Sequence, residues 1–325
     1  MACSIPWRGG CVADVPVPGL GERDFIATRL APLADTAAAR GLDDDAAVWT
    51  PPLGRDLVFT HDVLACGVHY LPSDPPSDIA WKLLAVNLSD LAAMGATPAG
   101  VLMGLGLSVA EDDGWREAFT AGLGRALTHF GVALWGGDTV SGLAAAVLGL
   151  TAIGYVEPGR ALARSGAQLG DDVWVSGTIG DAGLGLAIAQ GEAPVDKFLL
   201  NRFRRPEPRL ALGRALVGVA SACMDISDGL LIDADRLARA SGVGLSINLT
   251  AMTLSSAAAA RTRGDADLIA RATAGDDYEL LFTAPPGAVI PVGKTPVTRI
   301  GSVVSGVGIT LANGLGLPER LGWEH

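Results

Sequence analysis

The clearest hydrophobic pattern in the chain runs from Asp78 to Gly95. The apolar residues that recur in it at helical spacing are Ile79, Leu83, Val86, Leu88 and Leu91. Gly95 stands where such a helix would end, and Pro98 follows where a helix cannot continue. Asn87 and Asp90 are three residues apart and therefore share one face of the helix. Taken alone, these two polar residues fit the edge of a half-exposed helix as well as they fit a binding site.

Short apolar runs alternate with helix-like segments along the rest of the chain. Strands are expected at residues 57–60, 99–107, 132–135, 145–156, 172–176, 245–249 and 297–303, and helices at 25–38, 111–129, 181–190, 207–220 and 229–240. Pro158 and Gly159, with two arginines after them, change the character of the sequence and predict a domain boundary there. The length of 325 residues also indicates about two domains.

Composition narrows the class of protein. Hydrophobic residues make up 49% of the chain, yet no apolar run approaches the roughly 20 residues needed to span a bilayer. A net charge of −11 without a Lys/Arg cluster argues against nucleic acid or an anionic membrane as a partner. The four cysteines are scattered, which predicts reduced thiols and a cytoplasmic protein. Residues 1–20 contain no continuous apolar core, so we expect a poorly ordered lead-in rather than a signal peptide.

Aspartates recur where the expected strands and helices begin or end. They are Asp45, Asp62, Asp90, Asp138, Asp225 and Asp228. If several of them converge, cations must compensate their negative charges. Oxygen ligands without cysteine or clustered histidine favour Mg²⁺ over Zn²⁺. Mg²⁺ held by carboxylates, water and phosphate is typical of phosphoryl-transfer sites. The pattern therefore predicts a site where magnesium ions lie between the acidic protein and a phosphate-containing substrate.

Five segments, taken in order and at their separations, carry a family resemblance. They are Asn87–Pro98, Gly136–Thr139, Arg164–Gly166, Met224–Leu230 and Gly275–Leu280. From about Asp24 to its end the chain resembles the thiamine-monophosphate kinases, in the superfamily that includes aminoimidazole ribonucleotide synthetase and selenophosphate synthetase. The resemblance implies a two-domain α/β (α+β) fold. Residues 21–158 would carry a sheet that pairs with its copy in a dimer barrel, residues 159–325 would pack against it, and ATP would lie in the cleft between them.

The resemblance also implies a reaction, in which ATP and thiamine monophosphate give ADP and thiamine diphosphate. The six aspartates would be the magnesium ligands, with Thr60 and His61 near the metals. Nucleotide contacts would come from Gly137, Asp138, Arg164 and Ser227, and the thiamine substrate would face His69, Asp276 and Trp323. The acceptor phosphate is mostly a dianion at pH 7 and needs no general base. We therefore expect these residues to position the substrates and to neutralise charge.

Three residues depart from the family pattern, and two other classes of function stay open. Asp43 stands where the family usually has Gly, His61 replaces a small hydroxyl residue, and Asp276 replaces the usual Glu. The chain could be another ATP-using member of the superfamily. However, a selenophosphate synthetase would need a reactive Cys beside a Lys near the N-terminus, and Cys3 and Cys11 have no adjacent Lys. A non-catalytic nucleotide-binding scaffold would also keep this fold, but it would not need every aspartate.

Overall fold

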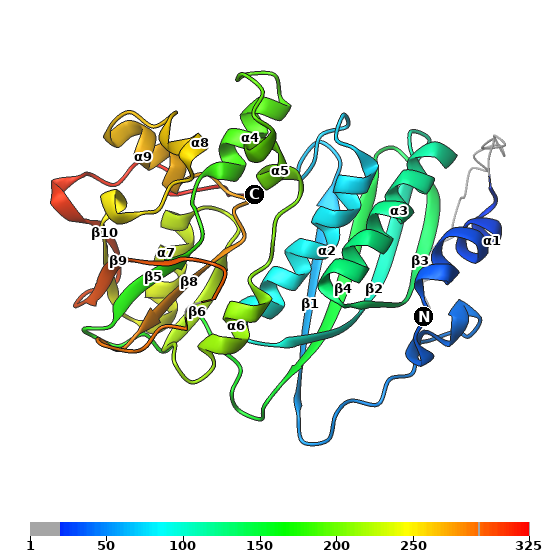
Figure 1. The fold of residues 1–325 in the computed structure, drawn as a ribbon, viewed down its shortest axis with the longest axis horizontal. Coiled ribbons are helices and arrows are strands. Elements are labelled where there is room, and N and C mark those ends of the chain that lie inside the picture. Colours follow the sequence, from blue (N-terminus) through cyan, green and yellow to red (C-terminus); the bar gives the residue numbers. More distant parts are fainter. Residues whose placement is uncertain (1–19, 292, 325) are drawn as a thin grey trace, which may run out of the picture.

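The computed structural model describes residues 20–291 and 293–324, and Figure 1 shows them as two sheet-containing halves placed side by side. The expected lead-in therefore lies outside the described residues, apart from Leu20. Both halves combine a sheet with helices, so the expected α/β fold class is confirmed. None of the helices described is long and apolar enough to cross a membrane.

The first half is built on a four-stranded sheet with the order β1-β4-β2-β3. Its strands and long helices are β1 (Asp56–Ala65), α2 (Pro76–Ala93), β2 (Thr97–Ser108), α3 (Asp113–Phe130), β3 (Ala133–Leu143) and β4 (Val147–Val156). Four short helical segments precede them: α1 (Glu22–Phe25), η1 (Ile26–Leu30), η2 (Ala31–Leu33) and η3 (Ala37–Leu42). β2 and β3 run parallel, and the other neighbouring strands are antiparallel. α2 and α3 lie across one face of this sheet (Figure 1).

The second half is built on a six-stranded sheet with the order β10-β7-β9-β5-β8-β6. Its strands are β5 (Asp172–Ser176), β6 (Ala222–Ile226), β7 (Gly244–Ile247), β8 (Glu279–Ala284), β9 (Val297–Val304) and β10 (Gly308–Leu311). Its helices are α4 (Asp181–Ala189), α5 (Lys197–Arg204), α6 (Leu210–Leu216), α7 (Leu230–Ser241), α8 (Ser256–Ala259) and α9 (Asp265–Ala272), with the short η4 (Leu249–Ala251) and η5 (Ala312–Gly314).

Local sequence explains the limits of the long helices. Pro76 stands in the first turn of α2, where its missing N–H costs nothing, and Gly95 adopts the left-handed φ of 68° just beyond its end. The Asp112 side chain caps α3 by accepting a hydrogen bond from the Trp115 N–H at 2.8 Å, and Gly131 ends that helix with a φ of 66°. These limits match the expected helices within about two residues.

The two halves meet along the C-terminal end of α2, which packs on α6. Gly213 makes this contact possible, because a Cβ there would lie 2.0 Å from the Ala92 carbonyl oxygen. A small hydrophobic cluster joins residues of α2 and α6 to the β6 and β8 strands. The Leu162 N–H also donates to the Met94 carbonyl at 3.1 Å, which ties the connecting segment to the end of α2. α2 is therefore buried on most of its surface, as its apolar sequence requires.

Several elements differ from the sequence expectation. The strand expected at 132–135 continues as β3 through Gly136–Thr139, because β3 stays paired with β2 up to Leu143. The backbones approach so closely that a Cβ at Gly137 would lie 1.8 Å from the Met103 carbonyl oxygen. The expected helix at 25–38 is divided into α1, η1 and η2, and the helix expected at 207–220 covers only Leu210–Leu216. The short α5, α9 and β10 were not predicted, since short elements leave weak periodicity.

Candidate active site

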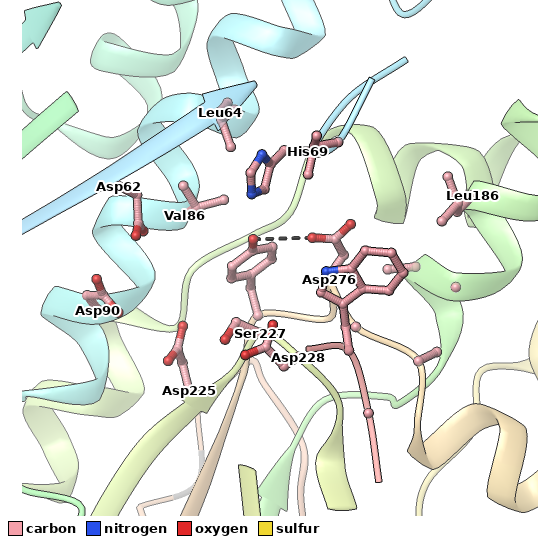
Figure 2. Close-up of a pocket in the computed structure, with 18 of the residues that line it drawn as sticks. Asp62, Leu64, His69, Val86, Asp90, Leu186, Asp225, Ser227, Asp228 and Asp276 are labelled. Carbon is pink, nitrogen blue, oxygen red and sulfur yellow. Dashed lines mark hydrogen bonds between the residues drawn. The ribbon is translucent and has the colours of Figure 1, made fainter. Parts of the chain in front are cut away.

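A cavity of about 560 Å³ opens between the two halves, and Figure 2 shows the side chains that line it. Nine of the predicted site residues line this one cavity: Asp62, His69, Asp90, Arg164, Asp225, Ser227, Asp228, Asp276 and Trp323. They come from β1, the loop after it, α2, the segment between β4 and β5, β6 and the turn after it, the loop before β8, and the segment after η5. Asp62, Asp90 and Asp225 lie on the left of the view, at what we call the carboxylate end of the cavity, and His69 and Asp276 lie to their right, near the centre (Figure 2).

The carboxylate end is organised by the α2 segment that the sequence singled out. Asn87 is fully buried, accepts a hydrogen bond from the Asp62 N–H at 2.9 Å and donates to the Leu83 carbonyl at 2.9 Å. Its amide therefore fixes the β1 backbone beside α2. Ser89 is also fully buried and donates from its hydroxyl to Asp225 at 2.8 Å. One helix thus holds the residues of two strands that belong to different sheets.

Alternation along β1 decides which of its side chains reach this end. Thr60 and Asp62 point to the α2 side of the sheet, and the Thr60 hydroxyl donates a hydrogen bond to Asp90. His61 points to the opposite face, where its Nδ1 lies 2.9 Å from the Thr151 hydroxyl. The predicted role of Thr60 beside the acidic group is therefore geometrically possible. The side chain of His61 is turned away from the cavity because neighbouring residues of a strand face opposite sides.

Burial and mutual repulsion dominate the electrostatics of the three carboxylates. Burial, and then the charge of Asp90, raises the pKa of Asp62 to about 6. The same two causes raise the pKa of Asp225 to about 8. Burial also raises the pKa of Asp90, although the Thr60 hydrogen bond and the charge of Arg164 oppose this. Ionising carboxyl groups held this way costs free energy unless a cation reaches them, and strongly shifted groups in a cleft are typical of functional sites.

Asp228 is held differently from the other aspartates. Arg236 pairs with it at 2.5 Å and with the fully buried Asp233 at 2.8 Å. Asp233 also accepts hydrogen bonds from the N–H groups of Ser227 and Asp228, both at 3.1 Å. Asp233 of α7 thus holds the turn that carries Ser227 and Asp228 through hydrogen bonds. Arg236 of α7 compensates part of the charge of Asp228.

The loop before β8 is held in an unusual backbone conformation. Asp276 and Tyr278 have positive φ angles of 69° and 50°, which non-glycine residues rarely adopt. Their N–H groups donate to the carbonyls of Ser227 and Ile226, both at 2.8 Å. The Tyr278 hydroxyl donates to Asp276 at 3.2 Å, which is the dashed line in Figure 2. Such strain persists only where the surroundings enforce it, and it often occurs at functional sites.

Asp45, Gly137 and Asp138 lie elsewhere. They line a second cavity of about 410 Å³ between the N-terminal segment and β3. Asp138 pairs in register with Gly104 and is exposed on the sheet face opposite α2. The structure therefore divides the predicted ligands between two places, and the roles expected for these three residues stay predictions.

The donor set at the carboxylate end suits a hard cation. Within residues 20–291 and 293–324, no three His, Cys, Asp or Glu side chains are close enough to hold a metal ion by themselves. Mg²⁺ commonly takes one or two carboxylates and completes its shell with water and substrate phosphates. Asp62, Asp90 and Asp225 offer only oxygen atoms, and mutual repulsion helps to raise the pKa of Asp62 and Asp225, so these residues fit that kind of site.

Sequence reasoning missed the residues that support the site. These are Ser89, Lys82, Asp233, Arg236 and Tyr278. Ser89 and Lys82 carry a usable signal, because each is a polar residue inside the apolar α2 run. Asp233 and Arg236 carry none, since a pair three residues apart on a helix is common on protein surfaces.

Comparison with known proteins identifies the family. Residues 43–156 match the domain family described as AIR synthase related protein, N-terminal domain. Residues 168–309 match the family described as AIR synthase related protein, C-terminal domain. The thiamine-monophosphate kinase of Salmonella typhimurium is 39% identical over 87% of this chain and 90% of its own length. The chain belongs to the thiamine-monophosphate kinase family.

Solved structures of this family share the fold over most of the chain. The thiamine-monophosphate kinase from Stenotrophomonas maltophilia K279a is 38% identical, with a TM-score of 0.77 over 87% of this chain and 94% of that one. A structure of AaThiL complexed with AMPPCP and TMP is 32% identical, with a TM-score of 0.77 over 94% of this chain and 97% of that one. The two-domain fold implied by the family resemblance is thereby confirmed.

Proposed function

We propose that this protein is a kinase that transfers the terminal phosphoryl group of ATP directly to thiamine monophosphate, giving ADP and thiamine diphosphate. One observation carries the proposal: Asp62, Asp90 and Asp225 converge from two sheets and one helix at one end of a cavity between the halves. Membership of the thiamine-monophosphate kinase family and the complex of a relative with AMPPCP and TMP support the choice of substrates.

The two ends of the cavity would bind different parts of the substrates. Arg164 and Ser227 lie towards the carboxylate end, where a guanidinium and a hydroxyl suit the phosphates of the nucleotide. His69, Asp276 and Trp323 would face the thiamine part of the acceptor. The acceptor phosphate is mostly a dianion and needs no base, so the protein has to place two polyanions in line.

Asp62, Asp90 and Asp225, with Asp228 beside them, would hold magnesium. When bound, Mg²⁺ would neutralise the charge of the carboxylates and of both phosphates, which is its usual part in phosphoryl transfer. Ser89 and Thr60 keep Asp225 and Asp90 in place without adding positive charge. In the same proposal Thr60 would act beside Asp90, and His61 would contribute only its backbone carbonyl, because its side chain faces the other side of the sheet. Metal contacts from Asp45 and Asp138 and a nucleotide contact from Gly137 would lie at the second cavity.

Product analysis by chromatography tests the reaction. Purified protein is mixed with ATP, MgCl₂ and thiamine monophosphate, with parallel samples that contain EDTA or free thiamine. We expect thiamine diphosphate only with the metal and only from the monophosphate. If ATP binds but no product forms, the protein is a nucleotide-binding scaffold or acts on another acceptor of the superfamily.

We also propose that the chain forms a homodimer through the open face of the four-stranded sheet. This face is the one opposite α2 and α3, and it exposes apolar residues: Leu57, Phe59, Val63, Leu102, Val140 and Val147. The strand register places Val140 and Val147 on either side of Gly106, and Leu102 and His61 on either side of Thr151, so these side chains share one face of the sheet. Contiguous apolar surface of this kind marks an interaction site, and two-fold dimers are the commonest homo-oligomers.

Light scattering coupled to gel filtration tests the dimer. Phe59 has an exposed fraction of 63%, and Phe59→Glu should convert a dimer to a monomer because it would bury an unpaired charge. The matched control is Leu169→Glu, at an apolar residue of the second half that is 66% exposed. Equal masses for both variants and the wild type would contradict the proposed interface.

The proposal also covers organisation and location. Residues 21–158 would form the ATP- and magnesium-binding dimerisation domain, and residues 159–325 the C-terminal α/β domain. A protein with two scattered free thiols in its described part, Cys66 and Cys223, suits the reducing cytoplasm. Expression of each range alone, followed by circular dichroism, tests the division into domains.

A further inference from the structure

Lys82 lies on α2 and contacts both loops that carry the proposed thiamine-facing residues His69 and Asp276, which we call the thiamine end of the cavity. Its side chain on α2 is only 2% exposed. The ammonium group donates to the His69 carbonyl at 2.9 Å and to the Asp276 carboxylate at 3.0 Å. It also lies 4.2 Å from the centre of the Phe203 ring on α5. One buried cation therefore contacts the loop after β1, the loop before β8 and a helix of the second half.

A buried lysine in an apolar helix needs a compensating role. Removing an ammonium group from water is costly unless its donors are all satisfied. The two hydrogen bonds and the aromatic face use the three N–H groups of Lys82. A methionine or leucine would fill the same space without this cost. Lys82 therefore has a role other than packing.

We propose that Lys82 is the positioning residue that sets the geometry of the thiamine-binding end of the cavity. This inference rests on the proposed kinase function. Lys82 is not one of the residues that line the cavity, so we assign it no direct contact with substrate. It acts through Asp276, whose other carboxylate oxygen accepts from the Tyr278 hydroxyl, and through the peptide that carries His69.

The backbone of the Asp276 loop explains why such a brace is needed. With a φ of 69°, Asp276 is in a conformation that relaxes when its side chain is released. The carboxylate end is held by separate contacts, from Thr60 to Asp90 and from Ser89 to Asp225. Loss of Lys82 should therefore disturb the thiamine end and leave the nucleotide end in place.

Steady-state kinetics of Lys82→Met test the inference, because methionine keeps the length and the packing on Phe203 but lacks the charge and the donors. We expect the KM for thiamine monophosphate to rise about tenfold, which corresponds to about 1.4 kcal/mol, while the KM for ATP changes less than about twofold. The matched control is Arg204→Met, which breaks the 2.7 Å ion pair with Asp74 between the same two halves. It should change neither KM selectively.

A double-mutant cycle separates positioning from general support. If Lys82 acts through Asp276, Lys82→Met should add little to the thiamine monophosphate KM of Asp276→Asn. Additive effects, equal rises in both KM values, or the same selective rise in Arg204→Met would overturn the inference. Lys82→Gln keeps an uncharged amide NH₂ as donor group and gives a second test should the Met variant fail to fold. Failure of the proposed function is separate, because the wild-type protein would then form no thiamine diphosphate.

Discussion

Two buried acidic residues on neighbouring strands meet opposite conditions. Glu279 on β8 has no exposed surface, and two arginines compensate it: Arg209 at 2.6 Å and Arg202 at 2.9 Å. The Ser176 hydroxyl donates to it as well, at 2.6 Å. Asp225 on β6 is only 4% exposed, yet its hydrogen bond comes from the neutral Ser89 hydroxyl, and its charged neighbours are other aspartates.

The difference separates a carboxylate that is paired within the fold from one that we propose binds magnesium. Glu279 and its arginines join β8 to α5 and to the segment before α6, so their charges are satisfied within the fold. Burial and the charge of Asp90 raise the pKa of Asp225 to about 8, so ionising it costs free energy until a cation arrives. A site that binds magnesium and phosphates needs carboxylates whose charge no cation of the protein compensates.

The largest effect is expected from Asp225→Asn, which tests the proposed difference between Asp225 and Glu279. Losing about 4 kcal/mol of transition-state stabilisation would lower kcat by about 10³-fold. The free energy of unfolding should stay the same or increase, because asparagine is neutral and avoids the cost of ionising or protonating a buried carboxyl group. Product analysis and urea unfolding measure the two quantities. Near-normal kcat would remove Asp225 from the proposed magnesium site.

Glu279→Gln should show the reverse behaviour. It leaves Arg202 and Arg209 buried without their partner, and breaking a buried ion pair typically costs about 3–5 kcal/mol of unfolding free energy. Urea unfolding measures the loss. The control is Arg299→Gln, which breaks an exposed pair with Asp172 and should cost less than about 1 kcal/mol. Similar losses in both variants would mean that burial does not set the value of these pairs.

Metal addition should distinguish the two groups directly. With a non-hydrolysable ATP analogue present, Mg²⁺ at about 100 times its Kd should stabilise the protein by about 2.7 kcal/mol and raise its Tm. Glu279→Gln should keep this rise, and Asp225→Asn should lose most of it. The analogue alone, with NaCl at equal ionic strength, is the control for thermal unfolding. An equal rise in Asp225→Asn would place the metal elsewhere.

The smallest expected effects come from the two serines that serve these carboxylates. Ser89→Ala removes one hydrogen bond to Asp225, and about 1 kcal/mol in the transition state corresponds to a fall in kcat of about fivefold. Ser176→Ala removes the hydrogen bond to Glu279 and leaves the Leu280 N–H without its acceptor, so it should lower the unfolding free energy by about 1–3 kcal/mol with kcat unchanged. The comparison fails if the two variants affect the same quantity.

The sequence by itself determined the long elements and most of the chemistry. Apolar periodicity predicted α2 and its end at Gly95, and the family resemblance carried by the ordered motifs implied the fold class and nine residues of one cavity. These features are local, since they depend on helical spacing and on turns that only glycine and proline favour.

Only the tertiary structure decided which polar residues meet. β-pairing carried β3 through Gly136–Thr139 and placed Asp138 on the open face, and strand alternation turned the side chain of His61 away from Asp62. Tertiary contacts placed two arginines beside Glu279, whereas the charged neighbours of Asp225 are aspartates. Such outcomes depend on contacts between residues far apart in the chain. No local pattern encodes the distance between two side chains that different sheets bring together.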